Sequence, residues 1–359
     1  MNKVFVDFHV IQSVPPSCLN RDDTGSPKTA VYGGVRRARV SSQSWKRAIR
    51  MMFKEYFGEK DLGIRTKRLV DLIAGEIHVR DGNISEEEAR KRAQKILKTA
   101  VVIKGDSEDT DALFFIGRQQ AVNLAELALQ GDTDKKTAQA TLNKDNTVDI
   151  ALFGRMVAND PALNAEASAQ VAHAISTHRV ETEYDYFTAV DDNPDPEVDH
   201  AGASMIGTIE FTSATLYRYA TVAAHDLFEE MLRDETALTV AIREFARAFI
   251  MAIPDGKQNT FAAHTPPDAV LVALRTDRPL NLVGAFEAPI PARGVGFAGL
   301  SAAALEKHAQ QVYGNFCGEP GKSFVVGEYL GELGTRLSLP ELLESIGAET
   351  VALCGGGQG

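Results

Sequence analysis

Residues 20–54, NRDDTGSPKTAVYGGVRRARVSSQSWKRAIRMMFK, combine a turn-rich loop, a short strand and a helix. Between Thr24 and Lys54 there are eight Lys and Arg residues and no Asp or Glu, although the whole chain has a net charge of −11. A basic segment inside an acidic chain predicts a binding site for a polyanion. The alternative is that these cations form the solvated face of an ordinary amphipathic helix.

The helix at the end of this stretch has an apolar face and a basic face. Ser41 or Ser42 suits its N-cap position. The apolar residues that follow have the spacing of one buried face: Trp45, Ile49, Met52, Phe53 and Tyr56. A second stripe holds Gln43, Lys46, Arg47, Arg50 and Lys54. Because free N–H groups and the positive dipole end lie at a helix N-terminus, we expect phosphate groups to bind near Ser41 to Ser44.

The loop before the helix supports a phosphate site. It adds the cations Arg21 and Lys28, and the Gly33-Gly34 turn permits a close approach of the backbone. A second polar loop, GKQNTFAA from Gly256, supplies positive charge only through Lys257, which Gln258 follows.

Size and composition describe a folded protein. The chain has 359 residues, of which 44% are hydrophobic, enough for one large domain or two ordinary ones. No apolar run approaches the roughly 20 residues that span a bilayer, and the start, MNKVFVDFHVIQ, alternates like a strand and does not resemble a secretion signal. We therefore expect a cytoplasmic protein with no membrane partner.

Motifs of common enzymes are missing from the sequence. It contains no G-x-x-x-x-G-K-[ST] loop, no strand-bound G-x-G-x-x-G and no G-x-S-x-G elbow, so a nucleotide-driven motor or an ordinary hydrolase is not expected. Cys18, Cys317 and Cys354 are far apart and odd in number, which fits a reducing compartment and gives no metal-ligand spacing. We predict no cofactor, no metal and no catalytic residue.

The periodicity along the chain predicts an α+β fold of ferredoxin-like type with two appendages. Helices are predicted at Thr66 to Gly75, Ser85 to Val102, Ala112 to Leu129, Thr133 to Asn143, Thr236 to Ile253, Leu300 to Phe316 and Leu339 to Ile346. Besides the N-terminal strand, strands are predicted at Val148 to Met156, Met205 to Val222, Ala269 to Leu274 and Phe324 to Tyr329. Ala165 to Arg179 has the Ala content of a helix and the alternation of a strand, and we favour the strand.

The second appendage covers residues 181–210. It holds nine acidic residues and no Lys or Arg, and Pro194 and Pro196 mark an exposed excursion. An aromatic and β-branched cluster precedes its tip: Tyr184, Tyr186, Phe187, Thr188 and Val190. From the residues alone, a small satellite core under the loop is the simpler interpretation of Tyr186 and Phe187.

Several long segments resemble one known family. They are SCLNRDDTGSPKTAVYGGVRRARVSSQSWKRAIR from Ser17, VDIALFGRM from Val148, HAISTH from His173, YFTAVDD from Tyr186 and LYRYATV from Leu216. Together they resemble the CasC backbone subunit of the type I-E CRISPR Cascade complex, in order along the whole chain. The resemblance is looser between residues 61 and 146 and after about residue 265.

This resemblance implies a right-hand shape: an RRM-like palm (residues 1–60 and 147–359), helical fingers (residues 61–146) and a thumb hairpin (residues 181–210). It also implies a non-catalytic subunit whose copies stack head to tail along a CRISPR RNA, present kinked RNA segments for pairing with target DNA in antiviral defence, and join other Cascade subunits.

Carried over by position, the resemblance implies two sets of site residues. The set that holds the RNA backbone is Arg21, Lys28, Ser41, Gln43, Ser44, Lys46 and Arg50, to which the weaker pair Lys257 and Gln258 is added. The set that wedges against bases is Met156, Tyr186, Phe187, Thr188 and Val190. An apolar or aromatic side chain replaces a lost stacking partner whatever the base, which suits a carrier of many guides.

Three further hypotheses concern the charged segments. The acidic tip, with Asp191 and Asp192, is expected to contact the basic Arg36-Arg37-Arg39 strand or the helix of the next copy. The alternative function is a metal-dependent ribonuclease that uses Asp191, Asp192 and one of the histidines: His173, His178, His200, His225 or His264. A basic-helix DNA regulator is disfavoured because no dimerisation element or helix-turn-helix accompanies the helix.

Overall fold

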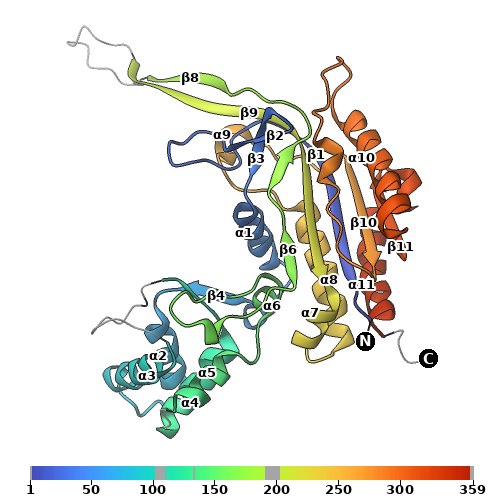
Figure 1. Cartoon of the computed structure of the whole chain (residues 1–359). Helices are drawn as coiled ribbons and strands as arrows, with labels where there is room; N and C mark the ends of the chain where they lie inside the picture. The colour runs from blue at the N-terminus through green and yellow to red at the C-terminus, as the bar shows by residue number, and fades with distance from the viewer. Residues whose placement is uncertain (1, 102–109, 111, 132–133, 191–202, 356–359) are drawn as a thin grey trace, which may run out of the picture.

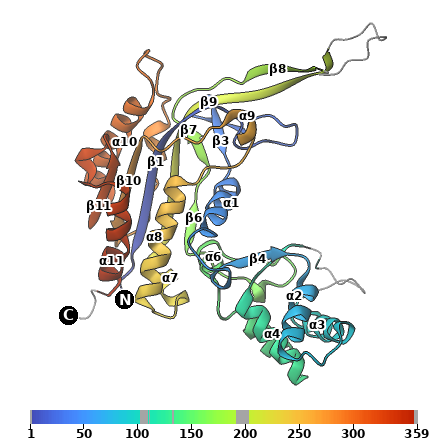
Figure 2. The same cartoon turned by 180° about the vertical axis from the view of Figure 1, so that it is seen from behind.

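The computed structural model describes residues 2–101, 110, 112–131, 134–190 and 203–355. In these residues a large, mostly antiparallel sheet carries helices on both faces, and a helical lobe and a long hairpin extend from it (Figure 1). The predicted α+β class is therefore confirmed. Figure 2 shows the hairpin and the lobe at opposite ends of the molecule, with α1 between them.

The strands of the large sheet follow the order β12-β11-β10-β1-β9-β7-β3-β2, and β6 and β8 also pair with β9. Their bounds are β1 Phe5–Ser17, β2 Thr29–Tyr32, β3 Val35–Val40, β6 Ala169–Val171, β7 Ala174–Ser176, β8 Glu183–Val190, β9 Ala203–Ala223, β10 Ala269–Arg275, β11 Lys322–Gly327 and β12 Thr335–Arg336. A separate two-stranded sheet pairs β4 (Gly63–Thr66) with β5 (Phe114–Gly117). Among the strands that the structure describes, pairing is antiparallel except between β11 and β12.

The helices lie in three groups. Those of the palm are α1 Ser42–Phe53, α6 Val148–Phe153, α7 Ala224–Glu230, α8 Glu235–Met251, α9 Gln258–Phe261, α10 Ala298–Val312 and α11 Leu339–Gly355. Those of the fingers are α2 Leu69–Arg80, α3 Glu86–Ala100, α4 Arg118–Gln130 and α5 Lys135–Leu142. Single turns lie at Glu59–Asp61, Pro161–Leu163, Val283–Phe286, Tyr313–Cys317 and Gly331–Leu333. None of the helices in the described residues is long and apolar enough to cross a membrane.

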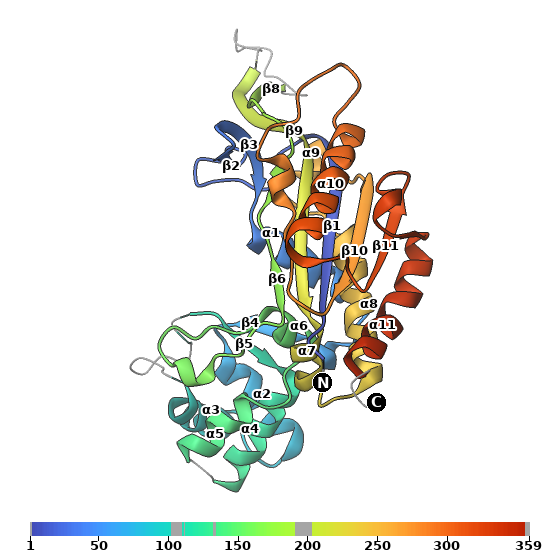
Figure 3. The same cartoon turned by 45° about the vertical axis from the view of Figure 1, so that its right-hand side comes forward.

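Strand β1 is buried on both faces of the sheet. Phe8 packs against Phe245 and Phe249 of α8, with ring centroids 5.5 and 5.9 Å apart. Residues of α1 join the same core, so α1, α8 and α11 cover one face. Ile11 belongs to a second core under α10 on the opposite face (Figure 3). The alternation of β1 therefore places apolar side chains in both cores.

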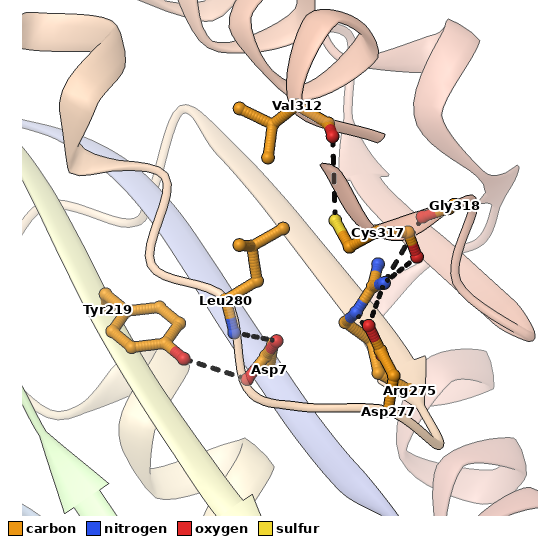
Figure 4. A network of polar contacts seen from close by, with 8 residues as sticks. All are labelled: Asp7, Tyr219, Arg275, Asp277, Leu280, Val312, Cys317 and Gly318. Atoms are coloured by element: carbon orange, nitrogen blue, oxygen red, sulfur yellow. Dashed lines mark hydrogen bonds and ion pairs between the residues drawn. The ribbon is translucent and has the colours of Figure 1, made fainter. Parts of the chain in front are cut away.

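The second face of β1 also carries buried polar groups (Figure 4). The Tyr219 hydroxyl and the Leu280 backbone N–H both donate to the Asp7 carboxylate at 2.9 Å. Nearby, the Arg275 guanidinium bonds the Asp277 carboxylate at 2.9 and 3.0 Å and the Cys317 carbonyl at 2.8 Å. These bonds fix the segment after β10 to the sheet.

The fingers have a core of their own, built mainly from α2 to α5. The helices predicted from Thr66, Ser85 and Thr133 are present with shifted ends. The helix predicted from Ala112 is wrong at its start, because Phe114–Gly117 forms β5 and pairs with β4 before α4 begins. The domain boundaries remain predictions, since the fold alone does not test them.

The strand predicted at Val148 to Met156 is wrong: Val148–Phe153 is helix α6. All six of its residues are buried, and periodicity cannot separate such a short apolar run from a buried strand. The strand interpretation of Ala165 to Arg179 holds where β6 and β7 pair with β9. The helix predicted to end at Ile346 continues as α11 to Gly355.

Candidate nucleic-acid interface

The N-terminus of α1 is capped as its sequence predicts. The Ser41 side chain accepts a hydrogen bond from the Ser44 backbone N–H at 3.4 Å, and Asn20 Oδ1 accepts one from the Ser41 N–H at 2.9 Å. Trp45, Ile49 and Phe53 are buried in the palm core. Gln43 is exposed and Ser44 is half-buried, so this helix end faces outward beside the loop that contains Asn20.

The loop of residues 18–28 is held against α1 and β3. The Lys28 N–H donates to the Asn20 carbonyl, and the Arg39 N–H donates to the Lys28 carbonyl, both at 2.9 Å. Arg21 is exposed at the rim of a surface hollow that Ser44 and the 255–256 segment also line. Two acidic residues of the loop, Asp22 and Asp23, border the same hollow, as does Asp255 of the other segment. The hollow is therefore of mixed charge.

A second loop, residues 254–263, lies against the first. A Cβ at Gly256 would stand 2.3 Å from the Leu19 carbonyl oxygen, so only Gly allows this approach. Burial raises the pKa of the Cys18 thiol, and the nearby charges of Arg21 and Lys257 oppose that rise. The structure thus brings two predicted RNA-binding cations, from distant parts of the sequence, to one place.

Gln258 has a structural use that the sequence did not reveal. Its side-chain amide donates to the Pro254 carbonyl at 2.9 Å, and its side-chain oxygen accepts from the Ala263 N–H at 2.8 Å. The nitrogen and the oxygen of the Gln258 side chain therefore both stabilise the conformation of the 254–263 loop. Lys257, in the left-handed conformation (φ 53°), immediately precedes α9. The RNA-contact role of either residue stays a prediction.

The other end of α1 meets the fingers. Arg50 forms an ion pair with the buried Asp149 at 3.1 Å, and its guanidinium lies 4.5 Å from the Phe115 ring centroid. Lys46 lies 5.6 Å from the ring centroid of Phe153. Arg50 is thus mainly enclosed between palm and fingers, whereas its predicted position was on an open basic face. Its role in RNA binding remains a prediction.

Arg65 of β4 is a further cation at this place, and the sequence interpretation missed it. Its guanidinium lies 4.6 Å from the centroid of the same Phe115 ring, and Arg65 and Phe115 are directly opposed in the β4–β5 pair. Because the sequence predicts a helical segment over residues 61–146, this cross-strand pair has no place in the prediction. The signal available was the β-branched and aromatic run Phe114-Phe115-Ile116.

The basic strand Arg36-Arg37-Arg39 is not one continuous positive surface. Arg37 is fully buried and donates to the carbonyls of Tyr32, Ser176, Phe286 and Glu287 at 2.8–3.4 Å. Arg39 donates to the Thr29 carbonyl and pairs with the His173 ring. Only Arg36 is exposed. The hypothesis that all three arginines receive an acidic tip is therefore wrong for Arg37, which is used inside the fold.

The thumb presents aromatic side chains on different faces. Tyr186 is 75% exposed and lies opposite Thr208, whereas Phe187 lies opposite Gly207 and is 37% exposed. A Cβ at Gly207 would stand 2.4 Å from the Phe187 ring, so this ring covers the glycine. Thr188 is exposed on the Tyr186 face. The side chain of Val190 and residues Asp191 and Asp192 lie outside the described part of the chain.

Met156 is 84% exposed, as a contact residue needs to be. It follows α6, whose neighbours include the β4–β5 sheet of the fingers. Figures 1 and 2 show α6 and the thumb at opposite ends of the palm. One chain therefore does not bring Met156 to Tyr186 or Phe187. A joint wedge requires two copies.

Of the candidate histidines that are described, His173, His178 and His225 have structural partners, whereas His264 is exposed. His178 stacks on Phe297, with ring centroids 3.7 Å apart, and His225 bonds the backbone of Val4. Burial and the charges of Arg39 and Lys28 lower the pKa of His173, so its ring accepts from Arg39 in the neutral form. Within the described ranges there is no group of three His, Cys, Asp or Glu side chains that could hold a metal. His200 lies outside those ranges.

The fold and this surface define an α+β protein in which several cations of the basic stretch lie along one palm helix and the loops beside it. The sequence matches the model of the CT1975-like protein family over residues 6–344, and the chain belongs to that family. No protein with a curated description matches the chain.

Two solved structures are similar over nearly the whole chain. One, described as "CRISPR RNA-guided surveillance complex, pre-nicking", has 32% sequence identity and a TM-score of 0.83, with 96% of this chain and 100% of that chain covered. Another, described as "CRISPR RNA-guided surveillance complex", has 28% identity and a TM-score of 0.73, with 96% and 99% covered.

Proposed function

We propose that this chain is a non-catalytic, CRISPR RNA-binding backbone subunit of a Cascade surveillance complex, of the CasC type in type I-E systems. Its copies polymerise head to tail along the guide RNA and present kinked RNA segments for pairing with target DNA in antiviral defence. Its partners are the CRISPR RNA, target DNA through guide pairing, neighbouring copies and other Cascade subunits. The proposed location is the cytoplasm.

The observation that carries this proposal is the similarity to surveillance-complex chains across 96% of this chain at up to 32% identity. The site geometry agrees with it. Arg21, Lys28, Lys46 and Lys257 lie on or beside the surface that runs from the 18–28 loop along α1. Such cations bind a phosphate backbone without reading its bases.

The palm also supports the proposed RRM-like fold. The order β1, α1, β7, β9, α8, β10 along the chain follows the β-α-β-β-α-β pattern of ferredoxin-like folds. In the sheet these strands are neighbours in the order β10-β1-β9-β7. Both α1 and α8 pack on one face. The remaining strands then extend this unit at its two edges.

Head-to-tail assembly explains why Met156 and the thumb lie far apart in one chain. A hairpin that projects beyond its own palm can reach the region after α6 only in a neighbouring copy. A contact between two different surfaces of identical chains produces an open array that grows with its template. The exposed Tyr186 is then a candidate to stack on a base displaced between copies.

The test is a length series of unstructured single-stranded RNAs with two unrelated sequences, mixed with the full chain and weighed by native mass spectrometry. We expect one more chain for each fixed increase in RNA length, whatever the sequence. A bound copy number that does not grow with RNA length contradicts polymerisation. Absence of RNA binding contradicts the function as a whole.

A matched pair of variants on α1 tests the proposed surface. Lys46→Gln is expected to weaken RNA binding. Lys54→Gln removes the same charge from the far end of the helix, where Lys54 is exposed, and is expected to weaken RNA binding less. Equal effects of the two substitutions would point to general charge attraction and against a defined site along α1.

The ribonuclease alternative predicts a different result. If the chain were an enzyme, RNA incubated with it and Mg²⁺ or Mn²⁺ would be cut, and Asp192→Ala would abolish the cutting. We expect intact RNA with both proteins. Cleavage by the parent chain that is lost in Asp192→Ala would favour the enzyme.

A further inference from the structure

Three cations meet where α1 of the palm contacts the β4–β5 sheet of the fingers. They are Lys46 and Arg50 of α1 and Arg65 of β4. Arg50 and Arg65 both lie over the Phe115 ring, at 4.5 and 4.6 Å from its centroid. The two guanidinium groups are thus placed by one aromatic side chain of the fingers. Cation–π contacts of this kind hold like charges near one another.

The backbone around Phe115 leaves little freedom. A Cβ at Gly63 would stand 2.6 Å from the Phe115 ring, so the ring lies directly against the β4 backbone. The Gly63 N–H donates to Asp149 Oδ1 at 2.8 Å, and the Arg50 guanidinium reaches the Gly63 carbonyl at 3.4 Å. Palm and fingers therefore share a closely packed joint, in which the position of Arg65 is fixed relative to α1.

The charges at this joint are not balanced within the described residues. Asp149 is buried and already accepts from Arg50, Gly63 and the Thr147 hydroxyl. Lys46 and Arg65 have no ion pair or hydrogen bond with any described side chain. Burial and the charge of Arg65 lower the pKa of Lys46. Burial and the charge of Arg50 lower the pKa of Arg65, an effect that Asp149 opposes.

Lys46 is also close to the phosphate site proposed at the start of α1. It lies five residues after Ser41, which is about 7.5 Å along a helix axis. A strand whose backbone passes the helix N-terminus therefore reaches Lys46 within about two nucleotides. Arg65, on the other side of the joint, is close enough for its charge to act on Lys46.

We propose that Lys46 of the palm and Arg65 of the fingers together bind one phosphate of the RNA backbone. This subsite deepens the proposed function and rests on it. Its ligand is a phosphodiester of single-stranded RNA, which neutralises two cations that the fold holds near each other. RNA binding thereby ties the fingers to the palm. The fingers contribute to guide binding through Arg65, although they belong to a different part of the sequence from the basic stretch.

The experiment measures how RNA affinity depends on salt for the full chain, with a short unstructured RNA as the probe. Arg65→Gln is expected to weaken binding at low salt roughly fivefold, the size of one modest charge contact. It should also reduce the slope of log affinity against log salt by about 0.7, the loss of one phosphate contact on a single strand. Arg65→Lys keeps the charge and is expected to retain the slope.

Arg68→Gln is the matched control. Arg68 lies three residues after Arg65, is 73% exposed in its side chain and pairs with Asp71, which keeps its second partner Arg90 at 2.8 Å. The Arg68→Gln substitution removes the same charge from the same region and leaves the residues of the joint unchanged. We expect its salt slope to equal that of the parent chain.

Amide hydrogen exchange gives a second readout that a general charge effect would not move. RNA is expected to slow exchange in Gly63–Thr66 of the parent chain and of Arg68→Gln, but not of Arg65→Gln. If Arg65→Gln binds RNA with an unchanged slope and shows the same protection, the subsite is wrong while the RNA-binding function stands. If the effect appears only with single-stranded DNA, the subsite belongs to the target strand and the proposal is overturned. If the parent chain binds no RNA, the proposed function itself fails.

Discussion

The guanidinium of Arg37 lies among main-chain carbonyls behind the β2–β3 turn. That turn has positive φ at both Gly33 (59°) and Gly34 (76°), which two glycines adopt without strain. The Tyr32 carbonyl before the turn and the Phe286 carbonyl from a distant segment both accept from Arg37. This arginine therefore connects three segments of the palm.

The substitution Arg37→Leu is expected to lower the free energy of unfolding by about 3 kcal/mol, because it leaves several buried carbonyls without a donor. Arg36→Leu is the control: Arg36 is the neighbouring residue, is exposed and should change stability by less than about 0.5 kcal/mol. Chemical denaturation can be followed by the fluorescence of Trp45, the single tryptophan, which is buried in the palm. Equal losses in both variants would contradict the structural role of Arg37.

The Asp7 carboxyl predicts an unusual pH dependence. Burial raises its pKa from 3.8 to about 6. Between these two values the unfolded chain releases the proton while the folded chain keeps it, so this group lowers stability as the pH rises from about 4 to 6. Above pH 6 the buried Asp7 carboxylate lowers the free energy of unfolding by the full amount, about 3 kcal/mol for a pKa shift of this size.

Asp7→Asn should therefore gain stability relative to the parent chain as the pH is raised from 4 to 7. Asp277→Asn is the control of opposite sign: burial favours its neutral form, but the hydrogen bonds from Arg275 and from backbone N–H groups, together with the charge of Arg275, lower the pKa of Asp277. Removing the Asp277 carboxylate should lower the free energy of unfolding most at neutral pH. Urea denaturation across this range measures both. A difference between Asp7→Asn and the parent that does not depend on pH would contradict the assignment.

At the scale of elements, the thumb separates two aromatic residues that the sequence groups together. Neighbouring residues of a strand point to opposite faces, and β8 follows this rule. Tyr186 shares a face with Thr188, whereas the Phe187 ring covers Gly207 on the other face. Only the first of these rings is free to meet a base without uncovering the hairpin backbone.

We therefore predict that Tyr186→Ala weakens binding of a length-matched RNA by about 1–3 kcal/mol at every sequence tested, since stacking does not depend on the base. Phe187→Ala should weaken it less. Fluorescence anisotropy with a polypyrimidine and a mixed-sequence RNA measures both. If Phe187→Ala has the larger effect, the wedge lies on the opposite face of the thumb.

The elements also show where sequence reasoning succeeds and where it stops. The α1 cap at Ser41 and the strand β9 were predictable, because local capping chemistry and a long alternating run decide them. Helix α6 was not, because a buried run of six residues has no exposed face to reveal its period. The β4–β5 pair was missed because its two strands are short and lie far apart in the sequence. Each strand forms only through its pairing with the other.

At the scale of the whole molecule, the candidate site was predictable in part. The basic stretch indicated α1 and its loop, and Arg21 and Lys46 are exposed or half-buried there. Charge alone could not show that Arg37 is buried or that Arg50 pairs with Asp149, because both depend on segments more than 90 residues away. Arg65 was missed because its position depends on the pairing of β4 with β5.

Strand β9 runs for 21 residues from the thumb into the centre of the sheet. Its first part pairs with β8 and its second part with β1, and the register shifts near Val14 and Ser17 of β1. Because these two parts form one continuous strand, no loop connects the thumb to the palm through β9. A lateral force on the hairpin is therefore transmitted to the hydrogen bonds between β9 and β1. The palm sheet thus resists bending of the thumb.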